Sequence, residues 1–292
     1  MTTPIPGTPG PGTPGPATPP PGPRAAVPAR AAAPAILAAR DAGFAYRGAP
    51  PVLHDVSLDI TAGRSLGLVG ESGAGKTTVL RLLLGLTRPT SGRILFDGDE
   101  LRLRDREQMR RFRRGVQSVF QDPYSSLDPR QRVSGIVAEP LRSLGLSRPA
   151  ARGAEDPRVA AALEAVGLPA DAARRYPHEF SGGQRQRIAI ARATVCDPRV
   201  LLADEPVSAL DVTTRVRIVD LLVELKETRG LTIAMVSHDL SVVAALCERT
   251  AVLENGRVVE QGDTAAVLGS PSHPYSRRLI ASVPRLPSPE TL

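Results

Sequence analysis

Short apolar segments dominate two parts of the chain and predict β-strands there. In the first part they span residues 36–46, 56–60, 65–69, 94–97 and 116–121, and in the second part 200–204, 232–237, 250–254 and 257–260. Helical patterns dominate between the two parts, from about residue 133 to 197. This order predicts an α/β sheet core that is interrupted by a helical insert.

The segment RVLLADEP, residues 199–206, contains a nearly unbroken apolar run. Such a run is typical of a strand buried on both faces in the middle of a parallel sheet. Asp204 and Glu205 then fall at the carboxyl end of the strand, where open α/β sheets bind ligands. The alternative is that the two acids only cap a helix that begins before Pro206.

Composition separates an N-terminal segment from the rest of the chain. Residues 1–34 consist mostly of Pro, Gly, Thr and Ala. A segment of this kind cannot bury enough apolar surface to offset the entropy of ordering it, so we expect it to be disordered with polyproline II character. The fold is therefore expected to begin near residue 35.

The remaining composition is that of a globular protein without membrane spans. The chain has 292 residues, of which 41% are hydrophobic, and no stretch approaches the roughly 18 apolar residues of a transmembrane helix. The N-terminus shows no charged region followed by an apolar run, so no secretory signal is expected. Cys196 and Cys247 lie in apolar settings and are expected to be buried, reduced thiols rather than metal ligands.

The net charge of +7 is concentrated in residues 101–115, LRLRDREQMRRFRRG. Such a run is usually a solvated helix or loop face. A groove for nucleic acid would want aromatic side chains for stacking, whereas this chain has no Trp and only 3% aromatic residues. We therefore expect no nucleic-acid partner.

The segment GESGAGKTT, residues 70–78, matches the phosphate-loop pattern G-x-x-x-x-G-K-[ST] directly after the predicted strand 65–69. Glycine suits such a loop because its amide N–H groups must face the phosphates, and the following helix adds its positive dipole end. Lys76, one of two lysines in the chain, carries a compact ammonium that can reach terminal phosphates. The alternative is a glycine-rich turn before an ordinary helix. The predicted phosphate-binding residues are Gly70, Glu71, Ser72, Gly73, Ala74, Gly75, Lys76, Thr77 and Thr78.

The acidic pair completes a site for magnesium and a water. Thr77 can offer its hydroxyl to Mg²⁺, and Asp204, expected one strand over, can hold the ion directly or through water. Glu205 is then placed to orient or deprotonate a water that attacks the γ-phosphate.

The segment FSGGQRQRIAIARA, residues 180–193, predicts a second anion site, because consecutive glycines precede an amphipathic helix. A second phosphate contact makes sense if two molecules pack head to tail, each presenting these glycines to the nucleotide held by the other. ATP would then lie between the two molecules.

Along residues 36–285 the chain resembles the nucleotide-binding subunits of ATP-binding cassette (ABC) transporters. GESGAGKTT resembles the Walker A loop, LLADEP the Walker B strand, and FSGGQ the signature motif, with Phe180 where leucine is commoner. The resemblance implies a P-loop NTPase (RecA-like) core with an antiparallel β subdomain and an inserted α-helical signature subdomain. The implied signature residues, which would contact the partner's ATP, are Ser181, Gly182, Gly183 and Gln184.

The resemblance also assigns roles to single residues. Gln121 in VFQDPYSSLDPR corresponds to the glutamine loop that reaches magnesium or water, Asp211 ends the D-loop SALD, and His238 corresponds to the switch histidine. Tyr46 resembles the aromatic residue that stacks on adenine. Each has a plainer alternative: Gln121 as a surface amide, His238 as the start of a helix, and Tyr46 as an aromatic residue at the edge of the core. The implied catalytic residues are Glu205, His238 and Gln121, and the implied Mg²⁺ ligands are Thr77, Gln121 and Asp204.

Several longer stretches resemble the oligopeptide, dipeptide and nickel importer subfamily, among them SPSHPYSRRLIASVP at residues 270–284. This implies a nucleotide-binding domain at 35–262 with a helical insert at about 126–192, and a C-terminal extension at 263–292. The implied activity is hydrolysis of ATP, with Mg²⁺, coupled to uptake of peptides (dipeptides or oligopeptides) or nickel across the cytoplasmic membrane; the sequence does not say which of these solutes is carried.

The implied partners are a second ATPase subunit, two transmembrane permeases and an extracytoplasmic solute-binding protein, with this chain peripheral on the cytoplasmic side of the membrane. The subfamily points to a non-identical second ATPase, and a symmetric pair is the alternative. A soluble cassette ATPase that acts on nucleic acid or ribosomes is the other functional class considered, but such proteins usually carry two cassettes or a coiled-coil insert.

Overall fold

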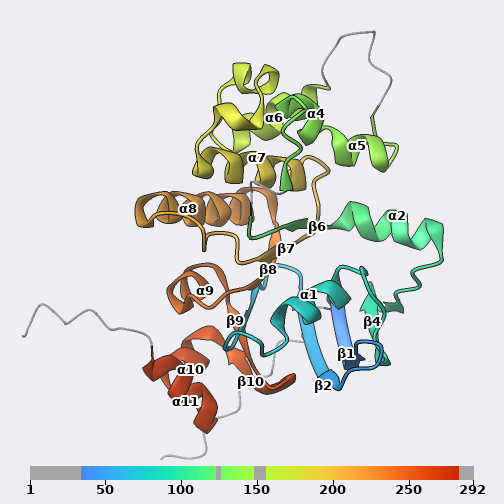
Figure 1. Ribbon diagram of the computed structural model, residues 1–292, viewed down its shortest axis with the longest axis vertical. Coiled ribbons are helices and arrows are strands. Elements are labelled where there is room, and N and C mark those ends of the chain that lie inside the picture. The colour runs from blue at the N-terminus through green and yellow to red at the C-terminus, as the bar shows by residue number, and fades with distance from the viewer. Residues whose placement is uncertain (1–33, 123–125, 148–155, 283–292) are drawn as a thin grey trace, which may run out of the picture. The chain divides into compact units, whose positions relative to one another are not determined.

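The computed structural model of the chain describes residues 34–122, 126–147 and 156–282 (Figure 1). The predicted disordered tail, residues 1–34, lies outside this part except for Pro34. The described residues form two β-sheets and several groups of helices.

The first sheet is antiparallel and has four strands in the order β2-β1-β4-β5. Leu37 at its centre is fully buried and pairs with Ile60 on one side and Phe96 on the other. The strands are β1 (Ala35–Ala45), β2 (Pro51–Thr61), β4 (Ser91–Phe96) and β5 (Asp99–Glu100). The predicted antiparallel β subdomain is therefore confirmed.

Strand β2 begins five residues before the predicted residue 56. The register shifts between the Phe44–Leu53 and Ala42–Val56 pairs, and Asp55 inside this bulge has a φ of 50°. A bulge breaks the two-residue alternation of side chains, so the sequence pattern showed only the second half of the strand.

The second sheet has six strands in the order β10-β9-β3-β8-β7-β6, parallel except for β10 at its edge. Residues 200–203 of β7 are fully buried, which confirms the prediction of a strand covered on both faces. The strands are β3 (Leu66–Val69), β6 (Val116–Val119), β7 (Val200–Asp204), β8 (Thr232–Val236), β9 (Arg249–Glu254) and β10 (Arg257–Asp263).

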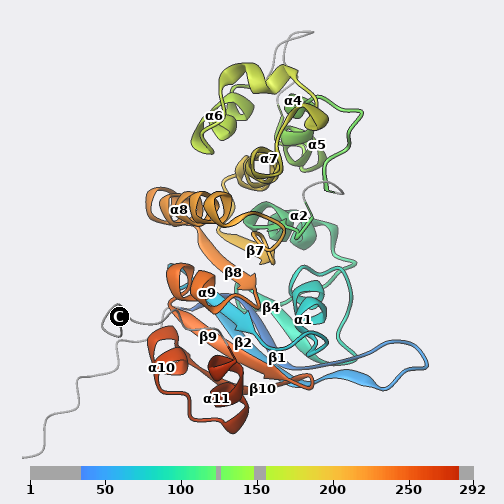
Figure 2. The same cartoon turned by 60° about the vertical axis from the view of Figure 1, so that its left-hand side comes forward.

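A group of helices lies between β6 and β7 in the chain and stands apart from β1 and β2 in both views (Figures 1 and 2). Leu141, Leu163 and Ile188 are fully buried in its core. The helices are α4 (Val133–Val137), α5 (Glu139–Ser143), α6 (Pro157–Ala165) and α7 (Gly182–Thr194), with short 3-10 turns at Ala170–Arg174 and Pro177–Glu179.

The basic run at 101–115 forms α2 (Arg106–Gly115), which Asp105 caps by accepting from the N–H groups of Glu107 and Gln108. Met109 and Phe112 face the core, whereas the arginines of this helix are exposed. The prediction of a solvated helix face is confirmed.

The remaining helices pack around the six-stranded sheet. They are α1 (Lys76–Leu83), α8 (Val212–Arg229), α9 (Leu240–Leu246), α10 (Thr264–Gly269) and α11 (Pro274–Ala281). Helix α8 was not predicted from the sequence, although its buried residues Ile218, Leu221, Leu222 and Leu225 have helical spacing. Helices α10 and α11 lie in the described part of the C-terminal segment.

Two further expectations from composition can be compared with the structure. Cys196 and Cys247 are buried free thiols, and burial raises their pKa to about 11 and about 12, respectively. Within the described ranges, none of the helices combines the length and apolarity that a bilayer crossing requires.

Candidate functional site: a phosphate loop and its cleft

The loop from Gly70 to Gly75 connects β3 to α1, which is the strand, loop and helix order that a phosphate loop requires. Gly70 has a φ of 155°, and a Cβ there would lie 2.2 Å from the carbonyl oxygen of Leu253. Gly75 has a φ of 104°, and a Cβ there would lie 2.7 Å from Leu53. Close packing against β9 and β2, in addition to ligand approach, therefore requires glycine at these two positions.

The side chain of Lys76 is held inside the loop by backbone carbonyl groups of the loop. Its Nζ donates hydrogen bonds to the carbonyl oxygens of Gly70 and Glu71, both at 2.8 Å, and the residue is 8% exposed. Burial lowers the pKa of Lys76, while the nearby Glu205 and Asp204 act in the opposite direction. The loop thus surrounds a positive charge whose present partners are neutral carbonyls.

A cleft of about 590 Å³ opens over this loop. Its volume is in the range of ligand sites. It brings together residues from distant parts of the chain: Gln121 follows β6, Glu205 follows β7, and His238 follows β8. The lining residues are Val52, Ser72, Gly73, Gly75, Lys76, Thr77, Thr78, Gln121, Glu205 and His238.

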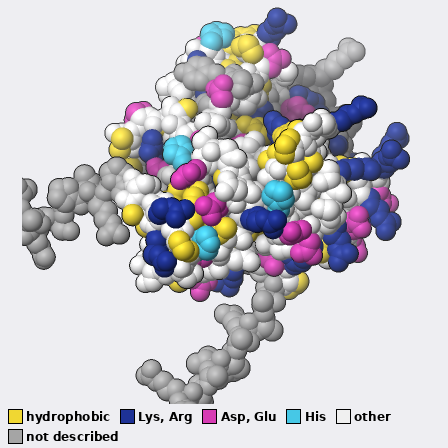
Figure 3. Space-filling view, turned by 60° about the horizontal axis from the view of Figure 1, so that its bottom comes forward, with side chains coloured by type: hydrophobic (Ala, Val, Ile, Leu, Met, Phe, Trp, Pro, Cys, Tyr) yellow, Lys and Arg dark blue, Asp and Glu magenta, His cyan; other side chains and the backbone are white. Residues whose placement is uncertain are grey.

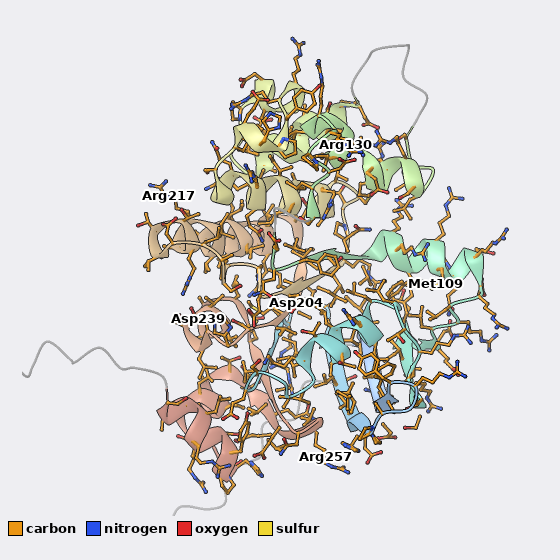
Figure 4. All side chains as sticks on the ribbon, in the orientation of Figure 1. Met109, Arg130, Asp204, Arg217, Asp239 and Arg257 are labelled. Carbon is orange, nitrogen blue, oxygen red and sulfur yellow. The ribbon has the colours of Figure 1, made fainter. Side chains whose placement is uncertain are left out.

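Asp204 ends β7 near the middle of the described structure (Figure 4). Burial raises the pKa of its carboxyl, and Glu205 raises it further, whereas Lys76 and Arg81 lower it. The expectation that Asp204 lies one strand over from the loop strand is wrong, because β8 lies between β3 and β7. Strand order in a parallel sheet depends on the crossover connections, which the local pattern of residues does not reveal.

Glu205 has a left-handed backbone with a φ of 45°. Among the described residues, the other non-glycine positions with positive φ are all Asp or Asn, which adopt this conformation more readily. Its N–H donates to the carbonyl oxygen of Val236 at 3.0 Å, which ties the turn after β7 to β8. Strain of this kind persists where the surrounding structure imposes it, often at functional sites.

The side chain of Glu205 meets His238, with 3.0 Å between Oε1 and Nδ1. The carboxylate is 18% exposed and the imidazole 64% exposed, so the ring lies on the solvent side of the pair. Asp239, the next residue, which is labelled in Figure 4, caps α9 and pairs with Arg215 at 2.8 Å. His238 thus immediately precedes the residue that caps α9 and also contacts Glu205, the first residue after β7.

Other predicted site residues lie outside the lining of this cleft. Tyr46 follows β1, is 45% exposed, and packs edge-to-face against Phe44 with 4.8 Å between ring centroids. Asp211 caps α8 by accepting from the Thr214 N–H at 2.9 Å. Hydrogen bonds from Thr214 lower the pKa of Asp211, which keeps it ionised as a helix cap.

The predicted signature residues begin α7. Ser181 and Gln184 form a capping box: the Ser181 hydroxyl accepts from the Gln184 N–H at 3.3 Å, and the Gln184 side chain accepts from the Ser181 N–H at 3.0 Å. Gly183 packs so closely on α8 that a Cβ would lie 2.3 Å from Cγ2 of Thr214. Ser181 and Gln184 are exposed, Gly182 and Gly183 are half-buried, and none of the four lines the chain's own cleft.

Two contacts of the loop were not anticipated from the sequence. The Gly256 N–H, from the β9–β10 turn, donates to the carbonyl oxygen of Ala74 at 3.0 Å. The Glu71 N–H donates to the hydroxyl of Tyr275 in α11 at 2.9 Å. The turn sequence Glu-Asn-Gly, residues 254–256, signals a hairpin, but nothing local to either segment signals its contact with the loop.

A family model described as "ABC transporter" matches residues 53–208. The "Putative peptide import ATP-binding protein" of Brucella ovis is 47% identical over 239 residues, which cover 82% of this chain and 74% of that protein. The "Glutathione import ATP-binding protein GsiA" of Salmonella typhimurium is 47% identical over 232 residues, which cover 80% of this chain and 37% of that protein.

Solved structures of the same kind match the fold. CbiO1 of Clostridium perfringens, described as part of an ABC transporter complex, superposes with a TM-score of 0.72 and 29% identity over 81% of this chain and 92% of that one. The ATP-binding cassette MJ0796, solved as a dimer bound to ADP and phosphate, superposes with a TM-score of 0.66 and 30% identity over 78% of this chain and 98% of that one. Together with the geometry of the cleft, these similarities show that the chain belongs to the ABC transporter family as one of its ATP-binding ATPase subunits.

Proposed function

We propose that this chain is the ATPase subunit of a peptide importer and binds MgATP in the cleft over Gly70–Thr78. The observation that carries the proposal is the convergence of Gln121, Glu205 and His238 on the phosphate loop from the ends of three different strands. The names of the relatives, peptide import and glutathione import, favour a peptide over the nickel ion that the subfamily resemblance also allows.

Thr77 and Gln121, which line the cleft, together with Asp204 near Lys76, fit a magnesium ion bound together with the phosphates. Mg²⁺ prefers oxygen ligands, and the proposed ones offer a hydroxyl (Thr77), an amide oxygen (Gln121) and a carboxylate (Asp204). The bound ion would neutralise charge on the β- and γ-phosphates. Lys76 would exchange its carbonyl partners for phosphate oxygens, a stronger interaction because both groups are charged.

Glu205 is the proposed general base for the attacking water. Its carboxylate is partly buried at the cleft, and the strained turn and the bond to Val236 hold its backbone in place. His238, which contacts this carboxylate, is proposed to sense the γ-phosphate and to position the water. Tyr46 is proposed to stack on the adenine from the end of β1.

The surface formed by Ser181–Gln184 is proposed to bind the nucleotide held by a second ATPase subunit, with Asp211 close to the same interface. Two features support this: the residues begin a helix of 13 residues, whose N-terminal end favours anions, and they lie outside the lining of the chain's own cleft. The second subunit is proposed to be a related, non-identical chain. Both would sit on the cytoplasmic side of the membrane beneath two permeases that receive solute from an extracytoplasmic binding protein.

We further propose that residues 35–262 form the nucleotide-binding domain, with the helical insert at about 126–192, and that residues 263–292 form a C-terminal extension. The helices α4 to α7 within this insert and the separate helices α10 and α11 support these boundaries.

Lys76→Ala tests the proposal, with Lys226→Ala as a matched control, since these are the two lysines of the chain. Lys226 lies in α8 and pairs with Glu248, away from the cleft. We expect Lys76→Ala to abolish ATP binding or hydrolysis and Lys226→Ala to retain both, measured by fluorescent-nucleotide titration and phosphate release. An unchanged affinity together with an unchanged rate in Lys76→Ala would contradict the loop assignment.

A further inference from the structure

The first peptide of the phosphate loop is bound from both sides. The carbonyl of Gly70 and the N–H of Glu71 belong to the same peptide group. The carbonyl accepts from Lys76 Nζ at 2.8 Å, and the N–H donates to the Tyr275 hydroxyl at 2.9 Å. Because a peptide group is planar and its N–H and C=O point in opposite directions, holding the N–H also sets the direction of the carbonyl.

We propose that Tyr275 is a positioning residue of the phosphate loop. By accepting a hydrogen bond from the Glu71 N–H, its hydroxyl fixes the orientation of the loop's first peptide and therefore the position of the Gly70 carbonyl oxygen that binds Lys76. The inference rests on the proposed role of this loop in binding the triphosphate. It gives a role to the segment SPSHPY, residues 270–275, which the sequence analysis could only match to a subfamily.

The Tyr275 ring is fixed by burial. The residue is 4% exposed and belongs to the same hydrophobic core as Val69, which immediately precedes the loop, and Val252 of β9. A buried aromatic ring with its hydroxyl at a polar partner is a typical arrangement for tyrosine. The acceptor therefore stands on a rigid support rather than on a mobile surface side chain.

The residues before Tyr275 hold its helix in place. Glu260 of β10 accepts hydrogen bonds from the N–H and hydroxyl of Ser272, at 2.7 and 2.8 Å, and from the N–H of His273 at 3.0 Å. His273 caps α11 by accepting from the Tyr275 N–H at 3.3 Å, and Pro274 occupies the first turn, where proline is favoured. Ser272 and His273 thus join α11 to β10, and His273 and Pro274 start the helix that carries Tyr275.

The hydrogen bond between Glu71 and Tyr275 joins the phosphate loop to a helix near the C-terminal end of the described chain. β10 and α11 follow the last strand of the parallel sheet, while the loop follows β3, about 200 residues earlier: Glu71 and Tyr275 are 204 residues apart. Figure 3 shows the side of the structure on which β10 and α11 lie, with acidic and basic side chains interspersed. The geometry therefore lets the C-terminal segment influence ATP binding directly through one hydrogen bond.

Tyr275→Phe tests this inference in the full chain, because it removes the acceptor and keeps the ring. We expect the Kd for a fluorescent ATP analogue to rise about three- to tenfold, the loss that one net hydrogen bond produces. The exchange of the Glu71 amide, followed by NMR on deuterated protein, should accelerate while the amides of β7 stay protected. Arg278→Gln removes an exposed ion pair with Glu254 and a guanidinium that lies 5.8 Å from the centre of the Tyr275 ring, but it keeps the Tyr275 hydroxyl, so it should bind the analogue like the wild type.

An unchanged Kd and unchanged exchange at Glu71 in Tyr275→Phe would overturn the inference, and so would exchange that accelerates equally throughout β7. If Tyr275→Phe does not fold, Glu260→Gln supplies the test, since it loosens the seat of α11 without altering Tyr275: a raised Kd supports the inference and a wild-type Kd contradicts it. Lys76→Ala separates the two proposals. If it loses binding while Tyr275→Phe does not, only the role of Tyr275 fails; if it binds like the wild type, the loop assignment fails.

Discussion

Glu205 is the residue at which local sequence and local structure disagree most. Glutamate rarely adopts a positive φ, yet the φ of Glu205 is 45°. A hydrogen bond from its backbone N–H to the carbonyl oxygen of Val236 holds this conformation. The conformation brings its carboxylate to within 3.0 Å of His238 at the cleft. Strain that places a carboxylate beside a phosphate loop is expected when the side chain has a chemical task.

Glu205→Gln is expected to retain ATP binding and to lower the hydrolysis rate about 10²- to 10⁴-fold, because the amide keeps the size of the side chain but cannot accept the proton of the water. The measurement is phosphate release at saturating MgATP, with nucleotide affinity determined in parallel. Glu227→Gln, on the exposed face of α8, is the matched control and should hydrolyse ATP at the wild-type rate. A wild-type rate in Glu205→Gln would remove this residue from the catalytic role.

Motifs predicted most of the residues that line the cleft, because a phosphate loop and the acid after a buried strand have fixed local patterns; Val52 was not predicted, and Asp204 was predicted but is not among the lining residues. They did not predict the bond between Glu205 and His238, the contact of Tyr275, or the backbone strain at Glu205. These depend on segments that are far apart in the chain and meet only through the order of strands in the sheet. Tyr46 and Ser181–Gln184 were identified by resemblance alone. The proposed partner of Tyr46 is the adenine of ATP and that of Ser181–Gln184 is the nucleotide of a second subunit, and neither partner is part of this chain.

At the scale of elements, the packing of α7 on α8 fixes the position of residues Ser181–Gln184 at the start of α7. Gly183 in the first turn of α7 has no room for a Cβ, which would lie 2.3 Å from Cγ2 of Thr214. Thr214 in turn provides the N–H that Asp211 caps. The glycine therefore has a packing role within the chain in addition to the proposed contact with a partner's nucleotide.

Gly183→Ala is expected to destabilise the protein by about 1–3 kcal/mol, because the added methyl group overpacks this contact. Thr214→Ser removes the clashing methyl group, so the double variant Gly183→Ala/Thr214→Ser should recover most of the loss. Urea unfolding at equilibrium measures both. The packing argument is wrong if Gly183→Ala is as stable as the wild type, or if the second substitution restores nothing.

The attachment of α11 to β10 should depend on pH in a defined window. Although burial alone would raise the pKa of Glu260, the hydrogen bonds that its carboxylate accepts from Ser272 and His273 help to lower it from 4.5 to about 2. A lowered pKa in the folded state means that the contribution to stability is complete above about pH 4.5 and is lost as pH falls toward 2.

Unfolding of the wild type and of Glu260→Gln at several pH values would test this window. The difference in unfolding free energy between them should be constant from pH 7 to about 5 and should narrow below 4.5. A difference that stays constant down to pH 3.5, or one that widens on acidification, would show that the ionised carboxylate does not hold this junction.

The five parallel strands of the larger sheet were predicted within two residues, because buried strands between turns have a clear apolar pattern, whereas the edge strand β10 extends three residues beyond the predicted residue 260. The first half of β2 was missed at a bulge, and α8 was not placed although its buried residues have helical spacing. The order of the strands, with β8 between β3 and β7, could not be predicted because it depends on the paths of the crossover connections.

At the scale of the whole molecule, the chain presents its proposed nucleotide contacts on two separate surfaces. One is the cleft over the phosphate loop, and the other is the start of α7 with Ser181 and Gly183. A single copy cannot use both on one nucleotide if the second surface lies outside the cleft. The arrangement makes sense when ATP binding joins two subunits and hydrolysis releases them, which would give the permeases two states to follow.

The most direct measurement is the structure of the Glu205→Gln variant with MgATP, together with its partner ATPase subunit and the permeases. The account predicts that Ser181 and Gly183 of this chain lie within hydrogen-bonding distance of the γ-phosphate bound by the other subunit, and that Lys76 holds the β- and γ-phosphates of its own ATP. A nucleotide-filled assembly in which Ser181–Gly183 face solvent, remote from both nucleotides, would contradict it.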